Sequence, residues 1–242
     1  MESAELSEDL RIRLGRLPVS ALTTVLATLG ITSAFMTGVR PLAPGQARMV
    51  GQAHTLRYIP SRPDVDTIES FSRPDALQRL VLEACPPGAV LVIDARGVTA
   101  SACAGDSFAQ RLQLKGCAGL VTDGGLRDVA DIAALDFPVY LQAPAAPPTF
   151  LSHHPVDSNV PIACGGVAVY PGDVIVGDQD GVVVIPFELT VAVTEGAEKI
   201  TAYDQFVDEK LREGRSLVGL YPATEESRAE YMTWQSRSGL PE

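Results

Sequence analysis

The fold is decided by residues 89–128, which read AVLVIDARGVTASACAGDSFAQRLQLKGCAGLVTDGGLRD. Two short apolar runs, at 89–93 and 120–122, are rich in β-branched residues and are typical of buried strands. Between them, residues 107–115 have the pattern of a helix that ends at Gly116. A strand, a helix and a second strand in this order predict a parallel or mixed sheet covered by helices.

The flanking sequence continues the same alternation on both sides. Helices are expected at 7–14, 20–29, 75–84, 128–135 and 188–212, and strands at 48–59, 138–141 and 162–170. A hairpin is expected from 174–176 to 182–185, because an Asp- and Gly-containing turn separates two apolar runs. Residues 143–159, rich in Pro, Ala and His, are expected to form a long loop. In the helix at 75–84 the predicted buried face consists of Leu77, Leu80, Val81 and Ala84.

The chain as a whole is expected to form one α/β domain over residues 1–242. Its last part, from about 187 to 242, is predicted to be a C-terminal helical arm of that domain, with a polar helix that carries Trp234. No clear linker separates this arm from the rest of the sequence.

Composition and charge exclude several classes of function. The net charge of −11 argues against a nucleic-acid surface, which needs clustered Lys and Arg. No 18-residue apolar stretch predicts a membrane span, and the start of the chain lacks the pattern of a signal peptide. The four cysteines form no CxxC pair, so a zinc site is not expected. A cytoplasmic location with reduced thiols is the expectation.

The residues that carry chemistry lie around the helix at 107–115. The N-terminus of a helix offers free N–H groups that suit a carboxylate or a phosphate, and Gly105 and Asp106 lie at this one. Arg127 and Asp128 follow the glycine turn after the next strand, at the edge where α/β proteins place ligands. Each also has a simpler interpretation: Asp128 as a helix N-cap, Arg127 as a solvated cation, and Asp106 as a first-turn acid. The sequence has neither a Walker loop nor a dinucleotide-binding fingerprint here.

These residues belong to a larger set that resembles a known family. The family is that of the divalent-metal-dependent pyruvate-type aldolases, which includes 4-hydroxy-4-methyl-2-oxoglutarate aldolases, related oxaloacetate decarboxylases and the regulator of ribonuclease E activity A (RraA). The resemblance covers roughly residues 17–222. It is carried by Gly105-Asp106, Gly116, Ala118-Gly119, Asp123-Gly124, Arg127-Asp128, Val160-Pro161, Cys164 to Val167, Pro171 to Val174 and Asp178 to Pro186.

The resemblance implies a fold and an assembly. The fold is a layered α/β/β/α sandwich, swivelling-domain-like and RraA-like, and the assembly is a homotrimer or a hexamer. It implies Mg²⁺ or Mn²⁺ at Asp128, with Arg127 in contact with a keto-acid substrate. The loop formed by Gly105, Asp106, Ser107 and Phe108 would bind the substrate carboxylate, and Asp106 would act as a base through water.

In the aldolases of this family a further acid reaches the site from a neighbouring subunit. Asp204 and Glu209, on the predicted helix at 188–212, are the candidates for that role. The helix at 107–115 departs from the usual pattern of the family, because Phe108, Arg111 and Leu112 stand where alanines are common. The identity of the substrate is therefore left open by the resemblance.

Two further groups of residues have simpler interpretations than a metal site. His153 and His154 fall in the expected long loop and are predicted to be a surface pair, since no third ligand lies at a useful spacing. Asp178 and Asp180 lack the later Glu of a calcium loop, so a hairpin turn is expected there.

Our first interpretation is an enzyme, a metal-dependent lyase that releases pyruvate from a 2-keto acid by retro-aldol cleavage or decarboxylation. The alternatives are a protein regulator that binds and inhibits an endoribonuclease, a dehydratase or hydrolase of sugar-acid type on the same site, and a structural trimer with a vestigial site.

Overall fold

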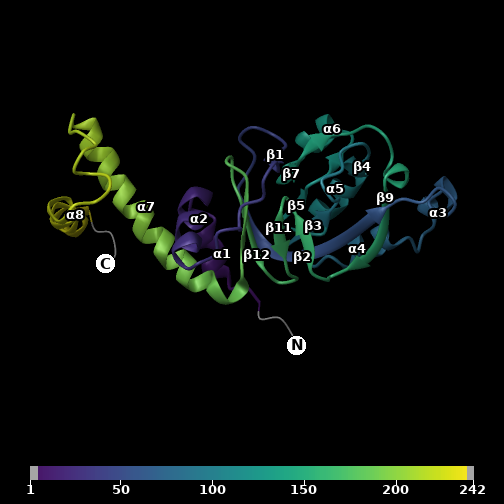
Figure 1. Ribbon diagram of the computed structural model, residues 1–242, viewed down its shortest axis with the longest axis horizontal. Coiled ribbons are helices and arrows are strands. Elements are labelled where there is room, and N and C mark those ends of the chain that lie inside the picture. The colour runs from purple at the N-terminus through teal and green to yellow at the C-terminus, as the bar shows by residue number, and fades with distance from the viewer. Residues whose placement is uncertain (1–4, 239–242) are drawn as a thin grey trace.

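The computed structural model describes residues 5–238, and its centre is a curled sheet of mixed direction (Figure 1). Along the sheet the strands have the order β1-β7-β5-β3-β2-β12-β13, and β9 pairs with the second half of β2. Their bounds are β1 (Arg40–Pro41), β2 (Met49–Pro60), β3 (Ala89–Asp94), β5 (Gly119–Thr122), β7 (Val139–Leu141), β9 (His153–Ser158), β12 (Val174–Gly177) and β13 (Val182–Ile185). Strands β2, β3, β5 and β7 are parallel, and β1, β9, β12 and β13 pair antiparallel. The mixed sheet predicted from residues 89–128 is confirmed.

Alternating side chains on these strands divide the molecule into four layers. On β3, Leu91 and Ile93 pack under helices α4–α6, whereas Val90 and Val92 face an inner core. On the β12–β13 hairpin, Ile175 faces the same inner core, while the neighbouring valines pack against α1, α2 and α7. The two groups of helices therefore lie on opposite sides of a β-sandwich (Figure 1). The predicted α/β/β/α arrangement is confirmed.

The helices on the two sides have the following bounds. On one side are α4 (Leu77–Ala84), α5 (Asp106–Leu114) and α6 (Val129–Ala133). On the other are α1 (Glu8–Leu14), α2 (Val19–Thr28) and α7 (Thr190–Arg212), which follows a short 3-10 turn, η2 (Phe187–Leu189). Within the described part of the chain, no helix combines the length and the apolar composition that spanning a membrane requires.

Strand β2 contributes side chains to each of the three apolar cores of the sandwich. Val50 packs with the residues of α1, α2 and α7, and Met49 and Ala53 lie in the inner core. Leu56 and Tyr58, further along the strand, belong to the core under α4–α6. Twelve residues are long enough for one strand to run from one layer into the next.

The C-terminal helices form an arm. Helix α7 extends beyond the body of the molecule, and α8 (Glu225–Ser238) lies at its far end (Figure 1). Four aromatic rings hold α8 there: Tyr203 and Phe206 of α7 contact Tyr231 and Trp234 of α8. Phe206 is fully buried at the centre of this cluster.

The expectation of a long loop at residues 143–159 is wrong. This segment contains β8 (Ala143–Pro144), a 3-10 turn η1 (Thr149–Leu151) and the six-residue strand β9. Pro155 is compatible with a strand here, because β9 pairs with β2 and with no other described strand. The register shifts at Arg57/Tyr58, where the pairing is irregular. An edge strand of this kind shows no alternation of apolar residues in the sequence.

Two smaller expectations are also corrected, and two further elements are added. In α4 the buried residues are Gln78, Val81 and Leu82, whereas Leu80 and Ala84 are exposed, because the helix rests on β9 and α5 along a different stripe. The single strand expected at 162–170 is a hairpin of two strands, β10 (Ile162–Cys164) and β11 (Val167–Val169). The small-residue stretch before α5 and the glycine turn after β5 pair as β4 (Ala102–Ala104) and β6 (Gly125–Leu126), which join β8 in a second sheet. A short helix, α3 (Ile68–Ser72), lies between β2 and α4.

Candidate functional site

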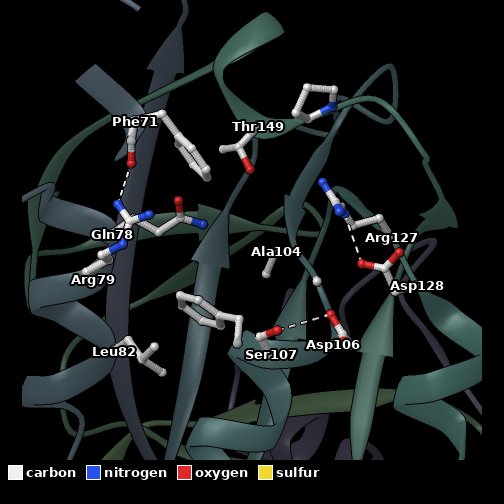
Figure 2. Close-up of a pocket in the computed structure, with 13 residues that line it drawn as sticks. Phe71, Gln78, Arg79, Leu82, Ala104, Asp106, Ser107, Arg127, Asp128 and Thr149 are labelled. Carbon is white, nitrogen blue, oxygen red and sulfur yellow. Dashed lines mark hydrogen bonds and ion pairs between the residues drawn. The ribbon is translucent and has the colours of Figure 1, made fainter. Parts of the chain in front are cut away.

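A cavity of about 280 Å³ opens where the small sheet of β4 and β6 meets the N-terminus of α5 (Figure 2). Its volume is at the lower end of the range for small-molecule sites. Helices α3 and α4 and the turn η1 close the other sides. The lining residues are Phe71, Gln78, Arg79, Leu82, Ala104, Gly105, Asp106, Ser107, Phe108, Arg127, Asp128, Pro148 and Thr149. All five residues predicted from the family resemblance to contact substrate, together with Asp128, therefore lie in one pocket.

Arg127 and Asp128 form an ion pair directly after the end of β6. The Arg127 backbone N–H donates to Ala104 O at 3.1 Å, which fixes the position of the pair beside β4. The Arg127 Nε donates to Asp128 Oδ2 at 2.9 Å, with both side chains partly accessible to solvent. Asp128 stands at the N-cap of α6, but its side chain makes no capping hydrogen bond. Its carboxylate lines the cavity and does not cap the helix, so the simpler interpretation of the Asp128 side chain as a helix cap is wrong.

The backbone of Asp128 has an unusual conformation, with φ 56° and ψ 37° in the left-handed region. Asp and Asn are the non-glycine residues that tolerate this region best. Such conformations cluster at functional sites, where the surrounding structure compensates for their cost. Here the left-handed turn directs the carboxylate back toward Arg127 and away from the first turn of α6.

Gly105 brings the N-terminus of α5 against this ion pair. A Cβ atom at Gly105 would lie 2.9 Å from Asp128 Oδ2 and 3.1 Å from Arg127 Cγ, so only glycine fits without displacing them. The Gly105 carbonyl accepts the first hydrogen bond of the helix, from Ala109 N at 3.1 Å. The N–H groups of the first turn have no carbonyl partner within the helix, and no described side chain caps them. They are available to a carboxylate in the pocket.

Asp106 and Ser107 complete this side of the pocket. Asp106 is the first residue of α5, and its Oδ1 accepts a hydrogen bond from Ser107 Oγ at 3.4 Å. In Figure 2 both side chains lie below Arg127 and Asp128, on the same side of the cavity. The pocket thus contains two carboxylates, one hydroxyl and one guanidinium within the region predicted from the sequence.

The donor set fits a hard divalent cation. Between residues 5 and 238 no cluster of three or more His, Cys, Asp or Glu side chains is arranged to hold a metal, which does not suit zinc. Mg²⁺ and similar ions need few protein ligands, since they keep several waters and take further oxygens from the substrate. Asp128, with Asp106 nearby, provides carboxylate oxygens of this kind in the cavity.

The opposite wall of the pocket was not predicted from the sequence. It consists of Phe71 from α3 and of Gln78, Arg79 and Leu82 from α4 (Figure 2). Gln78 is buried and its Nε2 donates to Cys103 O at 2.5 Å. The only signal in the sequence was a glutamine on a helix whose other buried residues are apolar. Contact between α4 and α5 creates this wall, and a contact between two helices is not predicted by any local sequence motif.

Asp204 and Glu209 are not brought to this pocket by their own chain. Both lie on α7, on the far side of the sandwich from α5 (Figure 1). Burial, and then the charge of Asp208, raise the pKa of Asp204, which lines a separate cavity between α2, α7 and α8. The Glu209 carboxylate accepts a hydrogen bond from Trp234 Nε1 at 3.0 Å. Their role in a neighbouring subunit stays a prediction.

The two histidines differ in burial, and only His154 reaches the surface. His153 is 1% exposed, its ring lies 5.3 Å from that of Tyr58, and its Nε2 is 3.3 Å from Ser101 O. Burial lowers the pKa of His153, which favours the neutral form of the ring. His154 instead forms a contact of 2.6 Å with Asp66. The surface prediction is wrong for His153, whereas His154 is partly exposed, and both residues belong to β9, which pairs with β2, rather than to a loop.

The hairpin turn expected at Asp178 and Asp180 is confirmed. Asp178 Oδ1 accepts from Asp180 N and its Oδ2 accepts from Val19 N, each at 2.9 Å. Both carboxylate oxygens therefore have backbone partners. The turn ties the β12–β13 hairpin to the start of α2.

Fold and site together define a class of protein: a mixed α/β sandwich with a pocket beside an Arg–Asp pair at a helix N-terminus. Comparison with known proteins identifies the family. The model of the RraA-like family (Aldolase/RraA) matches residues 4–184, and the chain belongs to this family.

Individual relatives differ in how much of the chain they match. A protein of Halalkalibacterium halodurans, provisionally named a 4-hydroxy-4-methyl-2-oxoglutarate aldolase, is 43% identical over 49% of this chain and 56% of its own length. The 4-hydroxy-4-methyl-2-oxoglutarate aldolase of Thermus thermophilus is 32% identical over 59% of this chain and 78% of its own. The crystal structure of RraAS2 from Streptomyces coelicolor, described as an unusual member of the RNase ES inhibitor RraA protein family, is 30% identical with a TM-score of 0.76. It covers 85% of this chain and 98% of that one.

Proposed function

We propose that this protein is a divalent-metal-dependent lyase that releases pyruvate from a 2-keto acid by retro-aldol cleavage or decarboxylation. The observation that carries this proposal is the Arg127–Asp128 pair held against the uncapped N-terminus of α5 in one cavity. The names of the aldolase relatives support the same reaction class.

The residues of the pocket divide the work of binding between them. The N–H groups at the start of α5 bind the carboxylate of the keto acid, and Gly105 lets the substrate and the Arg–Asp pair approach the helix closely. Arg127 donates to the keto oxygen, where negative charge develops as the carbon–carbon bond breaks. Asp128 would hold Mg²⁺ or Mn²⁺, which when bound supplies Lewis-acid stabilisation of that charge.

Proton transfer falls to Asp106. Retro-aldol cleavage begins with removal of a proton from the hydroxyl of the substrate, and decarboxylation needs no such step. In both reactions the bond to the departing carbon leaves its electron pair on the enolate of pyruvate, which then takes up a proton. Asp106 is the carboxylate in the cavity that has no guanidinium partner among the described residues, so in retro-aldol cleavage it is free to accept the hydroxyl proton and return it to the enolate through water. In decarboxylation the enolate takes its proton from solvent water.

We also propose that the active form is a homotrimer or a hexamer, in which Asp204 or Glu209 of one subunit completes the site of the next. The projection of α7 away from the body supports this arrangement (Figure 1), since the arm is free to reach another copy. Sedimentation of the intact protein checks the assembly. A monomer with full activity would contradict it.

The test of the reaction is pyruvate release, measured through lactate dehydrogenase and NADH. The substrates are oxaloacetate and 4-hydroxy-4-methyl-2-oxoglutarate, each with Mg²⁺, with Mn²⁺ and with EDTA. We expect metal-dependent release that is lost in Arg127→Ala. Absence of pyruvate from both substrates under every metal condition would refute the lyase.

A regulator of an endoribonuclease is the second candidate, supported by the similarity to the Streptomyces coelicolor protein. It predicts direct binding to a ribonuclease of the E type and inhibition that needs neither Mg²⁺ nor Arg127. A pull-down with the purified ribonuclease, with the Arg127→Ala variant as the matched sample, separates this candidate from the enzyme.

A further inference from the structure

The cavity contains a second guanidinium, on the wall opposite Arg127. Figure 2 shows Arg79 on one side of the cavity and Arg127 with Asp128 on the other. The Arg79 Nη1 donates to two backbone carbonyls, that of Phe71 and that of Arg73 at 3.0 Å. These bonds, and the Phe71 ring 5.3 Å from Arg79 Cζ, fix the guanidinium in place.

Arg79 differs from the arginines around it in having no acidic partner. Arg73 pairs with Asp75, and Arg111 pairs with Glu83. Across residues 5–238, no carboxylate lies within ion-pair distance of Arg79, and its Nε and Nη2 make no hydrogen bond. These two nitrogens form one edge of the guanidinium, which is the geometry that accepts both oxygens of a carboxylate.

The cavity between the two arginines has both polar and apolar lining, with the amide of Gln78 and the hydroxyl of Thr149 beside a set of apolar side chains (Figure 2). Leu82, Phe108 and Phe71 line it, and Ala104 forms its floor. The apolar part of this lining suits the carbon chain of a ligand that has a charged group at each end. Gln78, buried and hydrogen-bonded to Cys103 O, holds the wall beside Arg79 rigid.

We propose that Arg79 is the specificity residue that binds a second carboxylate, at the end of the substrate remote from the keto group. The inference rests on the proposed function, because it assumes that the keto-acid end lies at Arg127 and α5. Both test substrates named above are 2-keto dicarboxylates, and the inference gives Arg79 of α4 the role of selecting them over 2-keto acids with one carboxylate. The competing interpretation is that Arg79 only joins α3 to α4 through the two carbonyls.

A matched pair of non-reacting ligands tests the inference without turnover. 2-Oxoglutarate and 2-oxopentanoate have the same carbon chain and keto-acid group, and differ in a terminal carboxylate against a methyl group. Their binding is measured by calorimetry in the presence of Mg²⁺. We expect the protein to prefer 2-oxoglutarate by about 10- to 100-fold, the range for charge-assisted hydrogen bonds.

Three variants assign the preference to its source. Arg79→Gln should lose the preference by weakening 2-oxoglutarate alone, with 2-oxopentanoate unchanged. Arg79→Lys keeps the charge without the fork and should retain part of the preference. Arg111→Gln is the control, because it removes one guanidinium charge from a residue that pairs with Glu83 outside the pocket. This variant should bind both ligands as the unchanged protein does.

The outcomes separate this inference from the function on which it rests. If the unchanged protein binds both ligands equally, or if Arg79→Gln weakens both equally, Arg79 has no role in selection, while the lyase stands. If Arg79→Gln does not fold, Arg79→Lys decides: an undiminished preference for 2-oxoglutarate, or equal weakening of both ligands, also overturns the inference. If neither ligand binds with Mg²⁺, the proposed function fails and this inference fails with it.

Discussion

Gly105→Ala is the substitution for which the structure gives the sharpest expectation. The new Cβ would meet Asp128 Oδ2 at 2.9 Å and Arg127 Cγ at 3.1 Å, where ordinary contact begins at 3.4 Å. The ion pair must therefore retreat by about 0.3–0.5 Å. The backbone at Gly105 has φ −135°, which alanine adopts freely, so the substitution adds no backbone strain.

The magnitude follows from that displacement. A misplacement of about 1 Å at a reacting centre costs roughly 100-fold in rate, so half of that distance should cost about 10-fold or more. Loss of the 2.9 Å bond between Arg127 and Asp128 increases the loss further. We expect kcat/KM for pyruvate release to fall by about 10- to 100-fold. Stability should change by no more than about 1 kcal/mol, because both displaced groups reach solvent.

The control is Gly196→Ala, which crowds a neighbour equally but far from the pocket. Its Cβ would lie 2.9 Å from Val25 Cγ1, between α7 and α2. This variant should change the melting temperature and leave turnover of the folded protein unaltered. Full activity of Gly105→Ala at an unchanged melting temperature would refute the steric argument, because the Arg–Asp pair would then not depend on its place beside α5.

Three other predictions concern the metal, the pH and the arm. Asp128→Asn should reduce metal-dependent pyruvate release by about 10²- to 10³-fold with the fold intact, because asparagine tolerates φ 56° but lacks the charge; undiminished Mg²⁺-dependent turnover would contradict the site. Burial lowers the pKa of His54 below its ordinary 6.5, and its Nε2 has no hydrogen-bond partner. The stability that this neutral ring contributes is present above pH 6.5 and is lost as the pH falls below it. Between pH 8 and pH 5, the melting temperature should therefore fall less steeply in His54→Gln than in the unchanged protein. Parallel curves would show that another group controls this range. Phe206→Ala should lower the free energy of unfolding by roughly 3–5 kcal/mol and release α8 from the aromatic cluster. The chain has one tryptophan, so a red shift of Trp234 emission reports the release of α8. An unshifted spectrum would show that other contacts hold α8.

The elements with strong apolar patterns were predictable from the sequence. The runs at 89–93, 120–122 and 182–185 are buried strands because β-branched residues there are enclosed on both faces. The strand β9 was missed for the opposite reason. Its sequence, His153 to Ser158, contains a proline and two histidines, and it becomes a strand only through pairing with β2.

The site divides in the same way. Gly105, Arg127 and Asp128 were predictable because adjacent strands and a helix start bring local motifs to one edge. The conformation of Asp128 was not, since the sequence does not reveal a left-handed turn at a non-glycine residue. Arg79 was also missed, because its position in the pocket depends on how α4 packs against α5.

Strand β2 connects the three cores in a way that bears on cooperativity. This single strand places Val50, Ala53 and Leu56 in three different apolar cores. Because all three layers contain side chains of the same strand, none of them can unfold while the others keep β2 in register. The sandwich is therefore expected to unfold in one calorimetric transition, whereas the arm, whose aromatic cluster lies apart from β2, is free to open at a lower temperature of its own.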